Sequence, residues 1–287
     1  MAPLKKGHLQ GKIAALREQM RALKAVETQM HTDGQAQVSL TDPDARSMKN
    51  RDGGIVGYNV QAAVDAEHHL IVAHAVVTDG VDRDQLAPMA EQARQATGMD
   101  ELTVVADRGY FKGEQIRQCD EAGMTPIVPK PLTSNAGAEG RFDKRDFIYI
   151  ARDDEYRCPA GERAIRRFTT VENGLTIHKY WTSACPRCPL KAQCTPSPYR
   201  RIARWEHEAV LEAMQMRLDR QPELMRWRRC TVEHPFGTIK HWMGWTHFLM
   251  RTLVHVRTEM SLHVLAYNLK RVMRILGIGP LLRALQT

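Results

Sequence analysis

Three acidic residues stand at points in the sequence where they could gather into one metal site. Asp42 follows the strand-like run Val38 to Thr41, and Asp107 follows the apolar run Leu102 to Ala106. Glu233 lies in a later helical segment whose neighbours are basic. Carboxylates at strand ends can converge on a pair of Mg²⁺ ions, because hard divalent cations prefer oxygen ligands. Two ions about 3.5–4 Å apart can clamp the attacking and leaving oxygens of a phosphoryl transfer.

Basic residues accompany this glutamate. On helical spacing Arg229, Glu233 and Lys240 share one face, which would offer a metal ligand flanked by cations that bind phosphate. Pro235 predicts a kink that could turn Glu233 and Lys240 off this common face. Taken singly, these residues have simpler interpretations, since an Asp before Pro or Arg-Gly usually caps a turn and an Arg/Glu face is usually solvated. The predicted phosphate contacts are Arg226, Arg228, Arg229 and Lys240.

Four cysteines form a second constellation, with the spacing C-x26-C-x2-C-x5-C. Four thiolates satisfy a tetrahedral structural Zn²⁺ site, and small turn-rich segments rarely hold together without such a staple. An iron–sulfur cluster also takes four thiolates, and buried free cysteines are the third alternative. Cys119 and Cys230 fall in helical segments and are expected to be core residues. The four predicted zinc ligands are Cys158, Cys185, Cys188 and Cys194.

The net charge is unevenly distributed along the chain. Its 287 residues carry 41 Lys and Arg against 33 Asp and Glu, a formal charge of +8. Residues 1–150 hold 18 basic and 21 acidic side chains, whereas residues 151–287 hold 23 and 12. Such an asymmetry indicates a polyanionic partner met by one face, most simply nucleic acid or an anionic membrane surface.

The composition disfavours several classes of protein. With 43% hydrophobic residues the chain can bury a core, which argues against intrinsic disorder. No run approaches the roughly 18 apolar residues of a membrane-spanning helix, and the mean hydropathy is −0.43. Residues 1–6 have a basic opening without an apolar segment behind it, so no secretory signal is predicted. The expected location is a reducing cytoplasm.

The periodicity of apolar residues predicts a mixed α/β chain. Steps of three and four indicate an amphipathic helix from Leu9 to Met30. Between Val38 and Val128 the order β-β-β-α-β-α-β predicts one mixed sheet with an antiparallel hairpin that turns at residues 65–69. The predicted strands are 38–41, 55–64, 70–77, 102–106, 125–128, 147–151 and 175–181, and the predicted later helices are 84–96, 113–122, 205–218, 222–240 and 260–276.

A change of composition marks the domain organisation. Residues 131–203 are turn-rich and carry the four cysteines, so we expect an insertion with its own small core. The chain after Ile202 is predicted to be helical to its end. The predicted parts are an N-terminal helix and linker at 1–36, the first part of the core at 37–130, the cysteine-rich insertion at 131–203, and C-terminal helices at 204–287 that complete the core.

Four longer motifs, at residues 41–89, 104–130, 228–253 and 261–277, resemble the DDE transposases of bacterial insertion sequences. The nearest type is the insertion-sequence-1182 group within the broader insertion-sequence-4/5 class. Asp107, in the segment Ala-Asp-Arg-Gly-Tyr, matches the family's second Asp. The family's Arg-x3-Glu-x6-Lys signature matches Arg229, Glu233 and Lys240, although the tyrosine that often stands three residues earlier is replaced by Arg226.

The resemblance implies an RNase H-like fold that cuts and rejoins DNA with Mg²⁺ or Mn²⁺. Asp42 occupies the family's first-strand position and is the preferred first catalytic Asp, with Asp44 and Asp65 as alternatives. A turn role is the simpler interpretation of Asp65. The implied catalytic and metal-binding set is Asp42, Asp107 and Glu233.

The resemblance also implies partners and a cellular place. They are double-stranded DNA at the element ends and target, a second copy of the chain on that DNA, and the bacterial nucleoid. Members of the group usually carry a longer N-terminal region that recognises the element ends, so the chain is expected to be N-terminally truncated. Two other functions stay open: a non-catalytic DNA-binding remnant, and a repair-type nuclease that cuts without joining.

Overall fold

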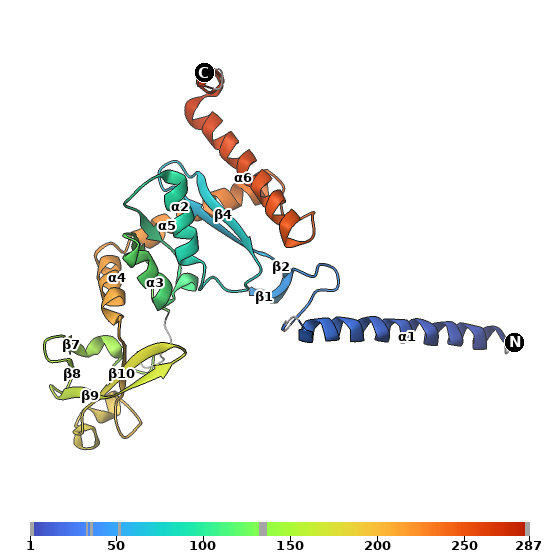
Figure 1. The fold of residues 1–287 in the computed structure, drawn as a ribbon. Helices are drawn as coiled ribbons and strands as arrows, with labels where there is room; N and C mark the ends of the chain where they lie inside the picture. Colours follow the sequence, from blue (N-terminus) through green and yellow to red (C-terminus); the bar gives the residue numbers. More distant parts are fainter. Residues whose placement is uncertain (1–2, 33, 35–36, 51–52, 132–136, 285–287) are drawn as a thin grey trace. The chain divides into compact units, whose positions relative to one another are not determined.

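The computed structural model describes all residues except 1–2, 33, 35–36, 51–52, 132–136 and 285–287 (Figure 1). The chain divides into two compact units, of which the first comprises Met1–Val81 with Val232–Thr287 and the second comprises Asp82–Thr231. The first unit is therefore built from two segments that are far apart in the sequence. The described strands form separate sheets of two, five, two and two strands, rather than the single mixed sheet that the sequence predicts for 38–128.

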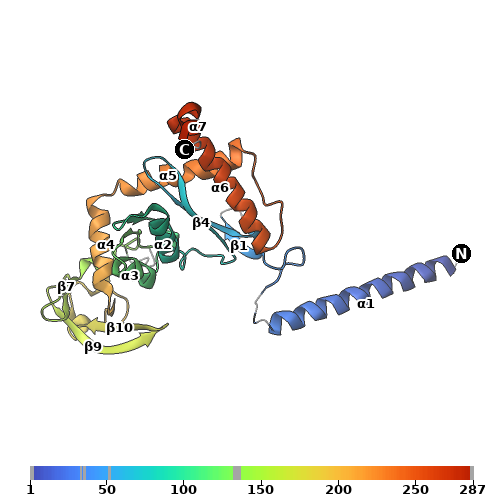
Figure 2. The same ribbon diagram turned by 45° about the horizontal axis from the view of Figure 1, so that its top comes forward.

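An antiparallel hairpin and one long helix organise the first unit. Strands β3 (Asn59–Val64) and β4 (Ile71–Val77) pair with each other, and helix α6 (Leu253–Leu276) packs against β4 (Figure 2). The apolar face of α6 repeats in steps of three and four, as a helix packed on a sheet requires. The buried core of the unit consists of Ile71, Val76, Ile239, Trp245, Val256, Met260, Val264 and Tyr267.

The remaining elements of this unit are shorter, apart from the first helix. Helix α1 (Pro3–Thr32) contains the predicted amphipathic segment and extends it at both ends. The predicted strand 55–64 is divided at Tyr58, so that β2 (Gly53–Gly57) pairs with β1 (Arg46–Asn50) while β3 begins afterwards. The strand predicted at 38–41 does not form. A short helix α7 (Ile278–Ala284) follows α6.

Helix α5 (Leu224–Gly237) crosses from the second unit into the first. Pro235 is accommodated inside this helix, and the chain continues without a break as a π-helical turn, Thr238–Trp242. The proline lacks the N–H that would bond to the carbonyl four residues earlier, and the helix continues past it without that bond. The helix then widens into the π-helical turn three residues later.

The second unit contains a compact α/β part. Strands β5 (Thr103–Val105) and β6 (Thr125–Ile127) are parallel and are joined through helix α3 (Gly113–Glu121). Helices α2 (Leu86–Thr97) and α4 (Glu208–Arg220) pack on α3. The sequence predicts these elements to within a few residues. Their shared core consists of Leu86, Ala90, Ala106, Ile116, Cys119, Met124, Val128 and Met214.

The cysteine-rich insertion forms a five-stranded antiparallel sheet within the second unit. Its strand order is β11-β10-β9-β8-β7, with bounds Ile202–Trp205, Leu175–Trp181, Arg163–Glu172, Glu155–Arg157 and Ile148–Ile150. One hydrophobic cluster lies against this sheet and consists of Phe147, Tyr156, Ala164, Tyr180 and Ile202. The sequence predicts only two of these five strands, because β8 and β11 are only three and four residues long and β9 is rich in charged residues.

The packing of α6 on β4 predicts a pH dependence of stability. His74 in β4 lies 3.0 Å from Ser261 of α6, measured from Nε2 to Oγ, and burial lowers the pKa of His74 below its usual value. The unfolded chain then binds this proton more strongly than the folded chain. We therefore expect the free energy of unfolding to fall as the pH drops below about 6.5.

Urea titrations between about pH 7 and pH 5 test this expectation. His74→Gln should lessen the fall in stability, whereas the same change at exposed His241 should leave it as it is. Identical pH profiles for all three proteins would contradict the assignment to His74.

Candidate functional site

Asp107 stands directly after β5, at the start of a 3₁₀ turn, Arg108–Tyr110. Its Oδ1 accepts a hydrogen bond from Gly109 N–H at 2.8 Å, and its Oδ2 pairs with Arg228 Nη2 at 2.9 Å. The Asp107 side chain is 44% exposed and that of Arg228 is 20% exposed. Asp107 is thus a held but accessible carboxylate at the end of a strand, as the sequence predicts. Arg228, predicted as a phosphate contact, forms an ion pair with Asp107 in this structure.

The carboxylate of Asp82, which the sequence does not predict as a site residue, lies close to Gly109, as the Asp107 carboxylate does. A Cβ atom on Gly109 would lie 2.9 Å from Asp107 Oδ1 and 3.4 Å from Asp82 Oδ2. Burial raises the pKa of the neighbouring Tyr110 hydroxyl well above its usual value, and the charges of Asp82 and Asp107 raise it further. Asp82 precedes α2 as one of three acidic residues within six positions, and nothing in the sequence distinguishes it from a helix cap.

Asp42 lies in the first unit and is only 8% exposed. Its Oδ2 accepts a hydrogen bond from Tyr58 Oη at 2.7 Å, and both carboxylate oxygens lie 3.2 Å from Thr252 N–H. Asp44 Oδ2 accepts from Leu253 N–H at 2.8 Å. Burial and the bond to Asp42 raise the pKa of Tyr58 well above its usual value. These two carboxylates therefore bind the first backbone N–H groups of α6 and act as its cap.

Asp65, the other alternative for the first catalytic position, has a local role. Its Oδ2 accepts a hydrogen bond from His68 N–H at 2.6 Å, and its own N–H donates to Leu70 O at 2.8 Å. These bonds close the turn between β3 and β4. The turn interpretation of Asp65 is confirmed.

Glu233 lies in α5 and is exposed to solvent. Among the described residues it has no hydrogen bond or ion pair. The next residue, His234, is anchored: its Nδ1 lies 2.9 Å from Tyr267 Oη, and that hydroxyl donates to His69 O at 2.7 Å. Burial lowers the pKa of His234, and the neighbouring His69 lowers it further. The backbone that carries Glu233 is thus fixed to α6 while its carboxylate is available.

Exposed basic and aromatic side chains accompany this helix. Arg226 and Arg229 are exposed, and Lys240 is an exposed cation whose Nζ lies 6.0 Å from the centre of the Phe236 ring. Trp227 is 63% exposed and Trp242 is 82% exposed. Exposed tryptophans beside cations can stack on bases of nucleic acid. By contrast, the tryptophans at 205 and 245 are buried in their units.

The four cysteines of the insertion lie in one region but do not form a metal-binding group. Cys158 and Cys194 pack against the core of the insertion, and burial raises the pKa of the Cys194 thiol, with the three other cysteines acting in the same direction. No group of three or more His, Cys, Asp or Glu side chains in the described part of the chain could hold a metal ion. Zinc is therefore a prediction from the cysteine spacing without structural support. Cys119 is buried as predicted, whereas the prediction for Cys230 is wrong because it is exposed.

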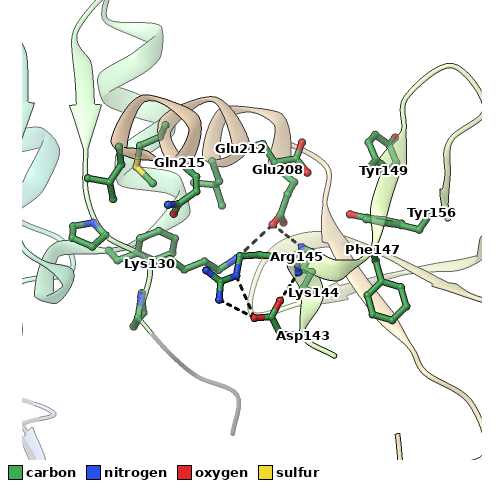
Figure 3. Close-up of a pocket in the computed structure, with 16 residues that line it drawn as sticks. Lys130, Asp143, Lys144, Arg145, Phe147, Tyr149, Tyr156, Glu208, Glu212 and Gln215 are labelled. Atoms are coloured by element: carbon green, nitrogen blue, oxygen red, sulfur yellow. Dashed lines mark hydrogen bonds and ion pairs between the residues drawn. The ribbon is translucent and has the colours of Figure 1, made fainter. Parts of the chain in front are cut away.

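A cavity of about 400 Å³ lies in the second unit where the insertion meets α4 (Figure 3). Glu208, 7% exposed, accepts from Lys144 Nζ at 2.6 Å and lies 3.6 Å from Lys130 Nζ. Burial disfavours the charged form of Glu208, but Lys144 and Lys130 outweigh it and hold its pKa below the usual value. At the rim, Arg145 is paired with Asp143. The cations of the cavity are thus already paired, and they join the insertion to α4.

The acidic residues differ in how well they suit a divalent cation. Carboxylate oxygens are the ligands that Mg²⁺ prefers, and Asp107 and Glu233 are accessible enough to serve. Asp42 fits less well, because both of its oxygens already accept hydrogen bonds.

In the part of the chain that is described, no helix is long and apolar enough to cross a membrane.

A mixed α/β chain with an exposed carboxylate at a strand end and a basic, glutamate-bearing helix is typical of enzymes that act on phosphodiesters. The family model described as the transposase DDE domain matches residues 24–269. Because this match covers most of the chain, the protein belongs to the DDE transposase family. Searches of curated proteins and of solved structures gave no match.

The contact at Gly109 predicts that a side chain at this position would displace the Asp107 carboxylate. In Gly109→Ala the new Cβ would displace the Asp107 carboxylate from its bond to the backbone, because 2.9 Å is shorter than a normal carbon–oxygen contact. We expect the free energy of unfolding to fall by about 0.5–1.5 kcal/mol, the usual net worth of one hydrogen bond, because the Asp107 side chain can move away and lose that bond.

The matched control is Gly137→Ala, where a Cβ would meet nothing within 4 Å. That exposed change should stay within about 0.5 kcal/mol of the wild type. Equal stabilities of the two variants in urea titrations would show that the Asp107 carboxylate is not held as described.

Proposed function

We propose that this protein cleaves and rejoins the DNA of an insertion sequence in a reaction that depends on Mg²⁺ or Mn²⁺. The family membership of residues 24–269 supports a transposase. The observation that carries the proposal is the Asp107 carboxylate, exposed at the end of β5 and held by Gly109 and Arg228. Double-stranded DNA at the element ends and target is the proposed substrate, and the nucleoid of the bacterial cytoplasm is the proposed place of action.

The proposed catalytic set is Asp107 and Glu233, with Asp42 at the first position. These residues would hold the metal ions, which when bound activate a water or a 3′ hydroxyl and stabilise the leaving oxygen. Each carboxylate contributes oxygen ligands and negative charge at the reacting phosphate. Asp107 also has a cationic partner within the chain, because Arg228 forms an ion pair with its carboxylate.

The basic residues of α5 would hold the DNA backbone. Arg226 and Arg229 are exposed, and within the described part of the chain neither forms an ion pair that would compete with phosphate. Lys240 extends the set into the π-helical turn. Arg228 differs from these residues, because it forms an ion pair with Asp107. Among the described residues, Arg228 Nε is buried and donates no hydrogen bond, so the guanidinium contacts Asp107 through Nη2. The guanidinium could turn toward a phosphate when Asp107 binds a metal ion.

Strand-transfer assays test the catalytic set. The substrate is a linear duplex that carries the sequences flanking this gene, with Mg²⁺ or Mn²⁺ present. Asp107→Asn and Glu233→Gln should each lower cleavage and joining by about 100-fold or more, since each removes a metal ligand worth several kcal/mol in the transition state.

Two controls match these substitutions in chemistry. Asp100→Asn and Glu223→Gln change exposed carboxylates elsewhere and should leave activity unchanged. Metal-dependent joining that survives in both catalytic variants would overturn the proposal. Cutting without joining would point to a repair-type nuclease, and DNA binding in EDTA without any cutting would point to a non-catalytic remnant.

Asp42 allows a separate test, because its proposed catalytic role and its bonds in the first unit predict different results. Asp42→Asn replaces an oxygen that accepts from Tyr58 or Thr252 by an NH₂ group that cannot accept. We expect the free energy of unfolding to fall by about 1–3 kcal/mol, the cost of leaving a buried group unsatisfied.

The same measurement on Asp107→Asn should show a much smaller loss, because that side chain is 44% exposed. If Asp42→Asn keeps full stability, its carboxylate is not the cap of α6. If Asp42→Asn keeps full strand-transfer activity, the first catalytic position lies elsewhere.

A further inference from the structure

The loop that leads from the π-helical turn to α6, residues 243–252, exposes two large apolar side chains (Figure 2). Leu249 is 81% exposed and Met250 is 47% exposed. Phe248 instead packs against the core of the first unit, and its ring centre lies 4.8 Å from that of Trp245. The loop is thus anchored by one apolar residue while the next two, which we call the loop tip, stay in water.

A buried carboxylate holds the backbone of the loop tip. Glu259 of α6 is only 8% exposed, and it accepts hydrogen bonds from Leu249 N–H and Met250 N–H, each at 2.9 Å. Trp245 Nε1 donates to the same carboxylate at 3.3 Å. Burial alone would raise the pKa of Glu259, but these hydrogen bonds outweigh it and hold the pKa below its usual value. The loop tip is therefore fixed before any partner binds.

The charges around the loop tip indicate the kind of partner. Glu259 is the only acidic residue that the sequence contains after Glu233, and its carboxylate is buried and used inside the unit. Lys240 and Arg251 are exposed. The surface of residues 234–287 therefore offers cations without acidic side chains between them. An apolar tip in such a setting is complementary to a polyanion that also has an apolar interior, which describes duplex DNA.

We propose that Leu249 and Met250 enter a DNA duplex from the minor groove as a wedge between two adjacent base pairs, while Arg251 contacts a backbone phosphate. Proteins that kink DNA insert Leu and Met side chains in this way. A backbone that is already fixed lowers the entropic cost of the insertion. The proposal rests on the proposed function for its partner, DNA. It goes beyond that function because the wedge uses none of the catalytic carboxylates.

DNA binding by the full chain in EDTA tests the wedge without any cleavage. The probe is a linear duplex that carries the sequences flanking this gene, with the fluorescent base 2-aminopurine placed in turn at successive positions. This base emits more strongly when it is unstacked, so the wild-type protein should raise the emission at one base step. Leu249→Ser with Met250→Ser should abolish the rise and weaken binding by about tenfold or more, which corresponds to the burial of one large apolar side chain.

The matched control is Leu262→Ser with Leu265→Ser. These leucines of α6 are 59% and 62% exposed, so the control removes similar apolar surface from the same unit outside the loop. It should bind and unstack DNA like the wild type. Leu249→Met keeps an apolar side chain at the loop tip and should also retain the rise in emission.

Two further variants separate the wedge from attraction by charge. Arg251→Gln should reduce the salt dependence of binding by about one phosphate contact, whereas the loop-tip variant should leave it unchanged. Glu259→Gln makes the chain more positive but puts an NH₂ group, which cannot accept, in place of one carboxylate oxygen. Charge alone would then tighten binding, whereas the wedge predicts a smaller rise in emission. Circular dichroism checks that each variant stays folded.

The outcomes distinguish this proposal from the proposed function. Cleavage and joining in Mg²⁺ without unstacking at any position would overturn the wedge and leave the proposed function standing. Unstacking in EDTA by a protein that never cuts would support the wedge and count against the proposed function. If the loop-tip variant still unstacks DNA, another segment is inserted. If it changes only the oligomeric state in sedimentation, the loop tip contacts protein, and the wedge is wrong.

Discussion

The first unit depends on two carboxylates that cap a helix from a distance of more than two hundred residues. Asp42 and Asp44 accept the N–H groups of Thr252 and Leu253, and so fix where α6 begins. Thr252 adopts a φ of +66°, which a β-branched residue rarely does, and the bonds to Asp42 offset that strain. Once its start is fixed, α6 lies along β4 and buries Val256, Met260, Val264 and Tyr267. The packing of α6 on the hairpin and the bond between His234 and Tyr267 of α6 both use a helix whose start these carboxylates hold.

Local patterns predicted most elements of the fold. The hairpin around Asp65, the helices at 84–96 and 113–122 and the long C-terminal helix follow from periodicity and turn residues, which act within a few positions. The strand predicted at 38–41 failed for a non-local reason: Asp42 and Asp44 are drawn to α6, and the chain before them runs to that contact rather than into a sheet. The sequence could not reveal that contact, because nothing near Asp42 signals a partner at Thr252.

The candidate site also contains some residues that local sequence patterns predict and others that they do not. Asp107 was predictable because a short apolar strand followed by an acidic residue and Arg-Gly is a local signal. Its partner Arg228 was identified as a basic residue of the right helix, but its ion pair with Asp107 was not predicted, since only packing decides which cation of a cluster reaches a carboxylate. Asp82 escaped notice because it looks like an ordinary residue before a helix. The cysteine spacing predicted a gathering of thiols, but spacing alone does not fix the distances that a metal ion needs.

The division of the chain has a consequence for how the protein is made. The first unit includes Val232–Thr287, so its hairpin cannot bury its core on α6 until Leu253–Leu276 has left the ribosome. The second unit is continuous from Asp82 to Thr231, and it can complete its own cores while the end of the chain is still being synthesised. A chain that stops early would therefore release a folded second unit attached to an unfolded hairpin, with Asp42 lacking the helix that it caps.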